Sequence, residues 1–317
     1  MNNVNQPSSN RRKSFFAYGY LLLTSILWGS GFIPQKIGAD NLSPFAFNGL
    51  RYLLAGFTIF CLARFRLPSS KEGRRITILS GSVLFIAAMI QQVGMKYTTI
   101  GNASFITTIY VALVPFLSFL LFRKKINRNS YIAAFLAIIG LYLLSTSGKS
   151  LDKMSIGDAI VFLGSAFWAL HIIIVGKASA KTDPIQFSSG QFLVCGLINL
   201  VCWGFSDPQA TGNLSGNWLI ILYSGIIVIA GGFTLQAVAQ KHAEASKAAI
   251  ILGLEAVFGS LSGILFLHES FSGIQVLGAV LIFASVLIAV QEDSESAEPA
   301  QGQIIESTNA VGEKSPI

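Results

Sequence analysis

Ten apolar segments, each about as long as a helix that crosses a bilayer, dominate this sequence. They run over residues 16–37, 44–64, 76–96, 101–122, 130–147, 157–177, 185–205, 218–240, 245–267 and 272–291. The turns between them collect charges, prolines and glycines, as in "RFRLPSSKEGRR" and "SDPQATGNLSGN". Membrane strands would be about half as long and would alternate in polarity, which excludes a barrel.

The charge content agrees with this pattern. The chain is 52% hydrophobic and 12% charged, whereas soluble domains carry about a quarter charged residues. In lipid, every backbone amide must find its hydrogen bond within its own helix. The sequence therefore predicts an all-α integral membrane protein with ten transmembrane helices in the lipid bilayer.

The positive charge is distributed by side of the membrane. The net charge of +7 would suit a nucleic-acid partner, but with the N-terminus inside, 17 of the 22 Lys and Arg residues fall on the cytoplasmic side. Four fall outside, and Arg51 lies within a span. This bias predicts a multi-pass protein of a bacterial inner membrane with both termini cytoplasmic, and no nucleic-acid partner.

The first half of the chain is repeated in the second. A shift of 140 residues lays "LWGSGFIPQK" over "FWALHIIIVGK", with Trp28 on Trp168, and also places Pro44 on Pro184. Repeats of this kind identify units that fold alike. Each unit holds five of the ten segments.

Later in the two halves the shift is 145 residues, because one loop is longer in the second half. This shift places Tyr110 on Glu255. The predicted divisions are a cytoplasmic N-terminal segment (1–15), a first five-helix repeat (16–147), a second five-helix repeat (156–291) and a disordered cytoplasmic tail (292–317).

An odd number of helices per repeat means that the second copy enters the membrane from the opposite side. The fold is therefore predicted to be two inverted five-helix repeats, related by a two-fold axis in the membrane plane. That arrangement is typical of secondary transporters, which bind their substrate near the midplane and expose it to each side in turn.

The segments "SILWGSGFIPQKIG", "RYLLAGF", "ASFITTIYVALVP" and "LEAVFGSLSGILFLHESFS" resemble the EamA-type transporters of the drug/metabolite transporter superfamily. The family motif Leu-Glu-Pro reads Leu254-Glu255-Ala256 here, and His268 replaces a later glycine. The resemblance implies a central cavity formed by the first, third, fourth, sixth, eighth and ninth helices, with the fifth and tenth outside it.

Glu255 is the acid nearest the centre of a span. An ionised side chain there costs about 3 kcal/mol on insertion scales, so it faces a cavity or a partner. It could bind a cationic group or carry a coupling proton. Alternatively, a protonated Glu255 hydrogen-bonds a neighbouring helix and stabilises the bundle.

Other intramembrane groups are candidates for substrate binding. Trp28 and Trp168 either flank the cavity from the two halves or pack the first helix against the sixth. Gln92 and Tyr110 offer neutral hydrogen bonds, and His171 could share a proton with Glu255.

Two cations remain near the spans. Lys36 could attract an anionic group or could extend to the headgroups. For Arg51 the favoured interpretation is an anchor that hydrogen-bonds the carbonyl groups of a neighbouring helix.

The prediction is a transporter that exports a small metabolite or drug-like solute, not an enzyme. No catalytic residue, cofactor or metal is predicted, because "SGKS" (147–150) lacks the earlier glycine of a phosphate loop and no metal-ligand spacing occurs. A lipid-linked carrier flippase is an alternative with the same fold. An intramembrane enzyme acting on a lipid would need a cluster of acids, His or Ser near one membrane face.

Overall fold

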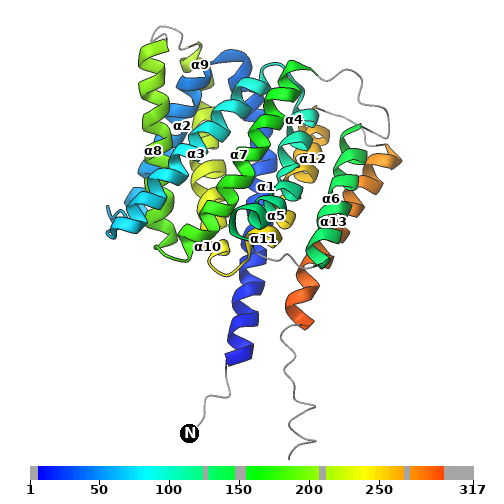
Figure 1. Cartoon of the computed structure of the whole chain (residues 1–317). Coiled ribbons are helices and arrows are strands. Elements are labelled where there is room, and N and C mark those ends of the chain that lie inside the picture. Colours follow the sequence, from blue (N-terminus) through cyan, green and yellow to red (C-terminus); the bar gives the residue numbers. More distant parts are fainter. Residues whose placement is uncertain (1–5, 124–127, 147–154, 207–211, 268–271, 296–317) are drawn as a thin grey trace, which may run out of the picture.

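The computed structural model describes residues 6–123, 128–146, 155–206, 212–267 and 272–295. Its first half consists of α1 (Gln6–Asn41), α2 (Pro44–Leu62), α3 (Lys71–Met95), α4 (Ile100–Thr108), α5 (Tyr110–Phe122) and α6 (Arg128–Thr146). Its second half consists of α7 (Ile156–Ser179), α8 (Pro184–Ser206), α9 (Leu214–Leu222), the π-helix η1 (Tyr223–Phe233), α10 (Thr234–Gln240), α11 (Ala245–Leu252), α12 (Glu255–Leu267) and α13 (Gly273–Glu295). The helices form one bundle (Figure 1).

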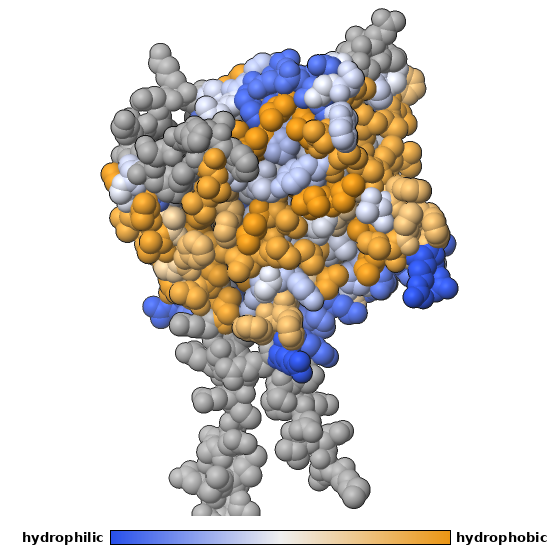
Figure 2. Space-filling model, turned by 180° about the vertical axis from the view of Figure 1, so that it is seen from behind, coloured by the Kyte–Doolittle hydropathy of each residue, from blue (hydrophilic) through white to orange (hydrophobic). Residues whose placement is uncertain are grey.

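The bundle is built to lie in a membrane, as predicted. Within the described part of the chain, 9 helical segments are long and apolar enough to cross a bilayer, and a shorter apolar helix runs over Arg128–Leu144. Figure 2 shows the apolar surface as a belt between hydrophilic ends. The sequence thus correctly predicts an all-α membrane protein with ten apolar helices.

The first and the last helix of the chain are longer than the sequence predicted. α1 begins at Gln6 rather than near residue 16, and α13 continues to Glu295 rather than ending at 291. α1 begins and α13 ends on the same side of the bundle (Figure 1). The remainder of the predicted tail, 296–317, lies outside the described residues, as does His268.

The two halves pack with the symmetry of an inverted repeat. α2 packs against α8, and α6 packs against α13, so each of these pairs joins equivalent helices of the two copies. α3 of the first half packs against α7 of the second. The equivalent contact is that of the eighth span, through η1 and α10, with α1. Both α2 and α8 begin with a proline in the first turn, where the missing amide hydrogen leaves no intrahelical bond unmade.

Small residues set the distances between symmetry-related helices. A Cβ atom on Gly56 would come within 2.8 Å of the Leu193 side chain, and one on Gly196 within 2.8 Å of Leu53. These two contacts exchange with each other under the shift of 140 residues. The repeat in the sequence is therefore also a repeat in the packing.

The fourth and ninth spans each contain one helical turn that is tighter than an α-helix, at equivalent positions. The amide of Ile109 bonds the carbonyl of Ile106 (3.2 Å), and the amide of Leu254 bonds that of Ile251 (3.1 Å), three residues back instead of four. α5 and α12 begin immediately after these points. The ninth span is therefore interrupted even though Ala256 stands where the family has proline.

Candidate functional site

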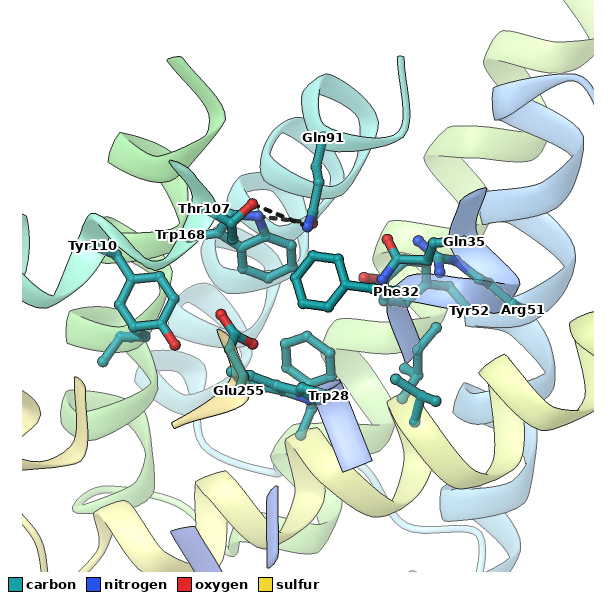
Figure 3. A pocket seen from close by; sticks show the side chains of 14 residues that line it. Trp28, Phe32, Gln35, Arg51, Tyr52, Gln91, Thr107, Tyr110, Trp168 and Glu255 are labelled. Atoms are coloured by element: carbon teal, nitrogen blue, oxygen red, sulfur yellow. Dashed lines mark hydrogen bonds between the residues drawn. The ribbon is translucent and has the colours of Figure 1, made fainter. Parts of the chain in front are cut away.

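A cavity of about 500 Å³, part of it open to solvent, lies in the centre of the bundle. Its walls come from both halves of the chain. The lining residues are Trp28, Phe32, Gln35, Arg51, Tyr52, Gln91, Thr107, Tyr110, Trp168, Ile172, Val228, Ile229, Phe233 and Glu255 (Figure 3). Most are apolar or aromatic, with a few polar groups that converge on the space, as in sites that bind small organic molecules.

An aromatic cluster forms one wall of the cavity. The rings of Trp28 and Trp168, which the repeat aligns, lie 6.5 Å apart between centroids. Phe233 of η1 contacts both, at 4.5 Å from Trp28 and stacked at 5.8 Å on Trp168. The indole Nε1 of Trp168 donates to Gln91 Oε1 (3.0 Å), whereas the Nε1 of Trp28 is buried without a partner. The rings offer an apolar aromatic surface with one free donor.

Glu255 is the first residue of α12 and its side chain is buried at 3% exposure. Its Oε1 lies 3.2 Å from the Thr108 hydroxyl, at the end of α4. The Tyr110 hydroxyl interacts with the same carboxyl group from the start of α5, although it makes no hydrogen bond of ordinary geometry. The residues that the 145-residue shift aligns, Tyr110 and Glu255, therefore meet in the cavity wall (Figure 3).

Arg51 lines the cavity from α2 and is 3% exposed. Its Nε donates to Asn48 Oδ1 (3.1 Å), and its guanidinium carbon lies 4.6 Å from the centre of the Phe47 ring and 5.4 Å from that of Tyr52. The hydrogen bond is to a side chain one turn away on the same helix, not to carbonyl groups of a neighbouring helix as the sequence suggested. Within the described residues, no acidic side chain pairs with it.

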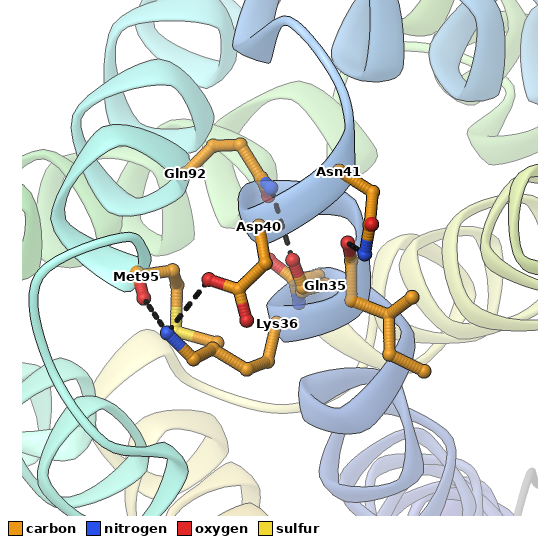
Figure 4. Close-up of polar contacts among 7 residues, drawn as sticks. Gln35, Lys36, Asp40, Asn41, Gln92 and Met95 are labelled. Carbon is orange, nitrogen blue, oxygen red and sulfur yellow. Dashed lines mark hydrogen bonds and ion pairs between the residues drawn. The ribbon is translucent and has the colours of Figure 1, made fainter. Parts of the chain in front are cut away.

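Three residues that the sequence predicted for the site, Gln92, Lys36 and His171, do not line this cavity. Gln92 Nε2 donates to the Gln35 carbonyl (3.0 Å), so Gln92 joins α3 to α1. Lys36 Nζ donates to Asp40 Oδ1 and to the Met95 carbonyl, each at 3.0 Å (Figure 4).

His171 is buried behind the Trp168 ring. The ring centroids lie 6.0 Å apart in an edge-on arrangement. Its Nε2 bonds Gln191 Oε1 (3.0 Å), and the Ser80 hydroxyl bonds the same oxygen (2.9 Å). Among the interactions described for His171, none reaches Glu255. Its partner is an amide, which positions the ring and does not exchange a proton with it.

Several residues that line the cavity were not predicted from the sequence. The second span was not expected to contribute, yet it supplies Arg51 and Tyr52. An uncompensated cation inside a span was the available signal for Arg51. Within the described part, no three His, Cys, Asp or Glu side chains lie close enough together to hold a metal ion.

The sequence profile of the EamA-like transporter family matches residues 15–146 and 155–291, one copy for each half of the bundle. The chain belongs to the EamA-like transporter family. This family consists of transporters, so an intramembrane enzyme is set aside as an alternative.

Individual relatives of this EamA-like protein agree with the family profile. A protein of Archaeoglobus fulgidus named "Uncharacterized transporter" is 31% identical over 276 residues, which is 87% of this chain and 86% of the relative. A protein of Salmonella typhimurium named "Probable amino-acid metabolite efflux pump" is 26% identical over 294 residues, 89% of this chain and 95% of the relative. A solved crystal structure superposes with a TM-score of 0.70 at 15% identity, covering 91% of this chain and 98% of the other, which shows the shared fold.

The cavity of this EamA-like transporter draws on the six helices that the resemblance implied, with the second span added. α6 and α13, the fifth and tenth apolar helices, contribute no described lining residue. They pack against each other at Gly140 and Gly278, where a Cβ atom on either would lie within 2.7 Å of the other's carbonyl oxygen. These two helices support the bundle from outside the cavity.

Proposed function

We propose that this EamA-like protein is a secondary exporter that carries a small organic solute through the central cavity by alternating access, with Glu255 as the group that takes up and releases a proton. The observation that carries the proposal is the position of Glu255. Within the described residues it is the one acid in the cavity wall, it is buried, and no cationic side chain pairs with it. Acids at such places in membrane proteins belong to ion and proton pathways.

The surroundings of Glu255 favour a neutral, protonated carboxyl group in this conformation. The Thr108 hydroxyl lies 2.7 Å from the Ser104 carbonyl and 3.2 Å from Glu255 Oε1. A hydroxyl has one hydrogen to donate, and the shorter contact takes it. A protonated Glu255 can then donate its own hydrogen to the Thr108 oxygen. An ionised Glu255 would be left buried with the Tyr110 hydroxyl as its one remaining neighbouring donor among the described contacts, which is costly.

A cycle follows from this. Solute enters the cavity from the cytoplasm and stacks against Trp28, Trp168 and Phe233. A cationic group on the solute, such as an ammonium, takes the place of the proton on Glu255. After the solute leaves on the far side, Glu255 is protonated again, and the empty cavity returns to its starting state. The name of the Salmonella typhimurium relative makes amino-acid metabolites the first solutes to test.

The test uses purified protein in liposomes with amino acids, amines and nucleosides on one side and an imposed pH gradient. For a transported solute, we expect Glu255→Gln to lower the rate of transport driven by the pH gradient at least tenfold. For solutes without a cationic group, exchange across the membrane without a gradient should continue, because the amide keeps the shape of the side chain. Glu244→Gln, which removes a carboxylate just before α11, is the matched control and should transport like the parent.

Two results would overturn the proposal. If Glu255→Gln transports normally at every pH while Glu255→Ala does not fold, the glutamate stabilises the bundle and does not couple transport. If vesicles containing the protein move lipid-linked sugars and none of the small solutes, the flippase alternative is correct. Expression and monodispersity of each variant are measured first, so that loss of protein is not taken for loss of coupling.

A further inference from the structure

We propose that Arg51 is the anion-binding residue of the cavity, and that it takes the carboxylate of a solute whose apolar body lies against the aromatic cluster. This assignment rests on the proposed function and adds to it, because it names a chemical group of the transported solute. It uses a different residue and a different helix from the proton-carrying role of Glu255. The two can therefore be tested separately.

Arg51 has unused hydrogen-bonding capacity among the described contacts. A guanidinium group has five N–H donors and no acceptor. The described contacts use one of them, Nε to Asn48 Oδ1. The Phe47 and Tyr52 rings lie close to the group and stabilise its charge through their π faces, but they accept no ordinary hydrogen bond. The donors at the outer end of the fork remain without a described acceptor.

The cavity wall holds a positive charge that no described acid neutralises. Arg51 is buried and keeps its positive charge, since a guanidinium cannot be deprotonated in a protein. Glu255, the acid of the wall, lies toward the other end of the lining, with aromatic rings between the two (Figure 3). The two charges therefore do not form an ion pair. A buried cation without a counter-charge is costly, and an anionic ligand removes that cost.

The shape of the guanidinium group and of its surroundings indicates the chemical class of the ligand. The planar fork of a guanidinium matches a carboxylate through two parallel hydrogen bonds, and such charge-assisted bonds are about twice as strong as neutral ones. Trp28, Trp168 and Phe233 provide an apolar surface in the same cavity. The site therefore fits an organic monocarboxylate with an aromatic or branched-alkyl body. In a solute that also carries an amine, the amine would lie toward Glu255.

The experiment measures equilibrium binding to the full-length protein in nanodiscs, and so does not depend on transport. The probes are matched pairs of a monocarboxylate and its neutral amide: 3-phenylpropionate with 3-phenylpropionamide, indole-3-propionate with its amide, and 4-methylpentanoate with its amide. We expect at least one acid to bind about tenfold or more tightly than its amide. The preference should vanish in Arg51→Gln, persist in part in Arg51→Lys, and be unchanged in the control Lys96→Gln.

A second measurement uses the parent protein, in case the Arg51 variants do not fold. Phenylglyoxal modifies arginine, and peptide mass spectrometry reports the modified fraction of Arg51. The preferred acid should protect Arg51 and its amide should not. Equal affinity for acid and amide in all three pairs, binding of no acid, or no protection of Arg51 overturns the assignment. Retention of the acid preference in Glu255→Gln supports it whether or not Glu255 couples transport to protons.

Discussion

Gly29 on α1 faces the backbone of α12 where Glu255 begins that helix. A Cβ atom at this position would lie 2.6 Å from Phe258 Cβ, 2.8 Å from the Gly259 amide nitrogen and 2.9 Å from the Glu255 carbonyl oxygen. Two of these atoms are backbone and cannot rotate away. The absence of a side chain at Gly29 therefore lets the first and ninth spans approach closely beside the cavity.

For Gly29→Ala we expect a loss of about 1–3 kcal/mol in stability, because the added methyl forces two packed helices apart. Thermal unfolding in detergent measures it. Gly19→Ala on the same helix is the matched control, since a Cβ atom there meets nothing within 4 Å. Alanine is also the better helix former, so the control should be neutral or stabilised by up to about 1 kcal/mol. An unchanged melting temperature for Gly29→Ala would contradict the close approach seen here.

At the scale of elements, η1 distinguishes the second half of the chain from the first. The eighth span runs through α9, η1 and α10, with eleven residues of π-helix in its middle, whereas its counterpart in the first half, α3, is α-helical throughout. π-Helical turns are rare and occur often at functional sites. η1 supplies Val228, Ile229 and Phe233 to the cavity. Its shape places Gly232 directly beside the Trp28 ring.

Two neighbouring glycines of η1 provide a test of this placement. A Cβ atom on Gly232 would lie 2.7 Å from Trp28 Nε1, whereas one on Gly231 would have its nearest contact at 3.4 Å, on Leu27. We expect Gly232→Ala to displace the indole, shift the tryptophan fluorescence and weaken solute binding severalfold. Gly231→Ala should leave the tryptophan fluorescence and the solute affinity close to those of the parent protein. Identical spectra and affinities for the two variants would mean that η1 does not hold Trp28.

For the bundle as a unit, the two-fold packing of the halves supports the proposed alternating access. Equivalent helices meet across the bundle, α2 with α8 and α6 with α13. The cavity lies between the halves, so an exchange of their conformations would open it to the opposite side. The start of α1 and the end of α13 lie on one side of the bundle (Figure 1), as an even number of spans requires.

The cation distribution predicts that this side is the cytoplasm. Fusions to a reporter that is active only outside the cytoplasm test this. A fusion at the C-terminus should be silent, and so should one after residue 69, in the basic loop between α2 and α3. A fusion after residue 42, in the turn between α1 and α2, should be active. Activity of the C-terminal fusion would refute the predicted orientation.

Composition and spacing along the chain were enough to predict the membrane class, the ten apolar helices and the division into two equivalent halves. These properties depend on composition and on spacing along the chain, which lipid makes decisive because unpaired backbone groups and charges are so costly there. The alignment of Trp28 with Trp168 and of Tyr110 with Glu255 also followed from spacing. Residues at equivalent places near a two-fold axis come together once the halves pack.

Which side chains face the cavity depends on how the helices pack, and this could not be predicted from the sequence. Gln91 lines it, but Gln92 bonds the Gln35 carbonyl, and likewise Gln35 lines it while Lys36 does not. Successive residues of a helix point about 100° apart, so a modest rotation of a span exchanges such neighbours. No pattern along an apolar segment fixes that rotation, because lipid and protein interior favour the same side chains. The direction in which Arg51 points is set by α2 packing against its neighbours, and only the folded bundle shows it.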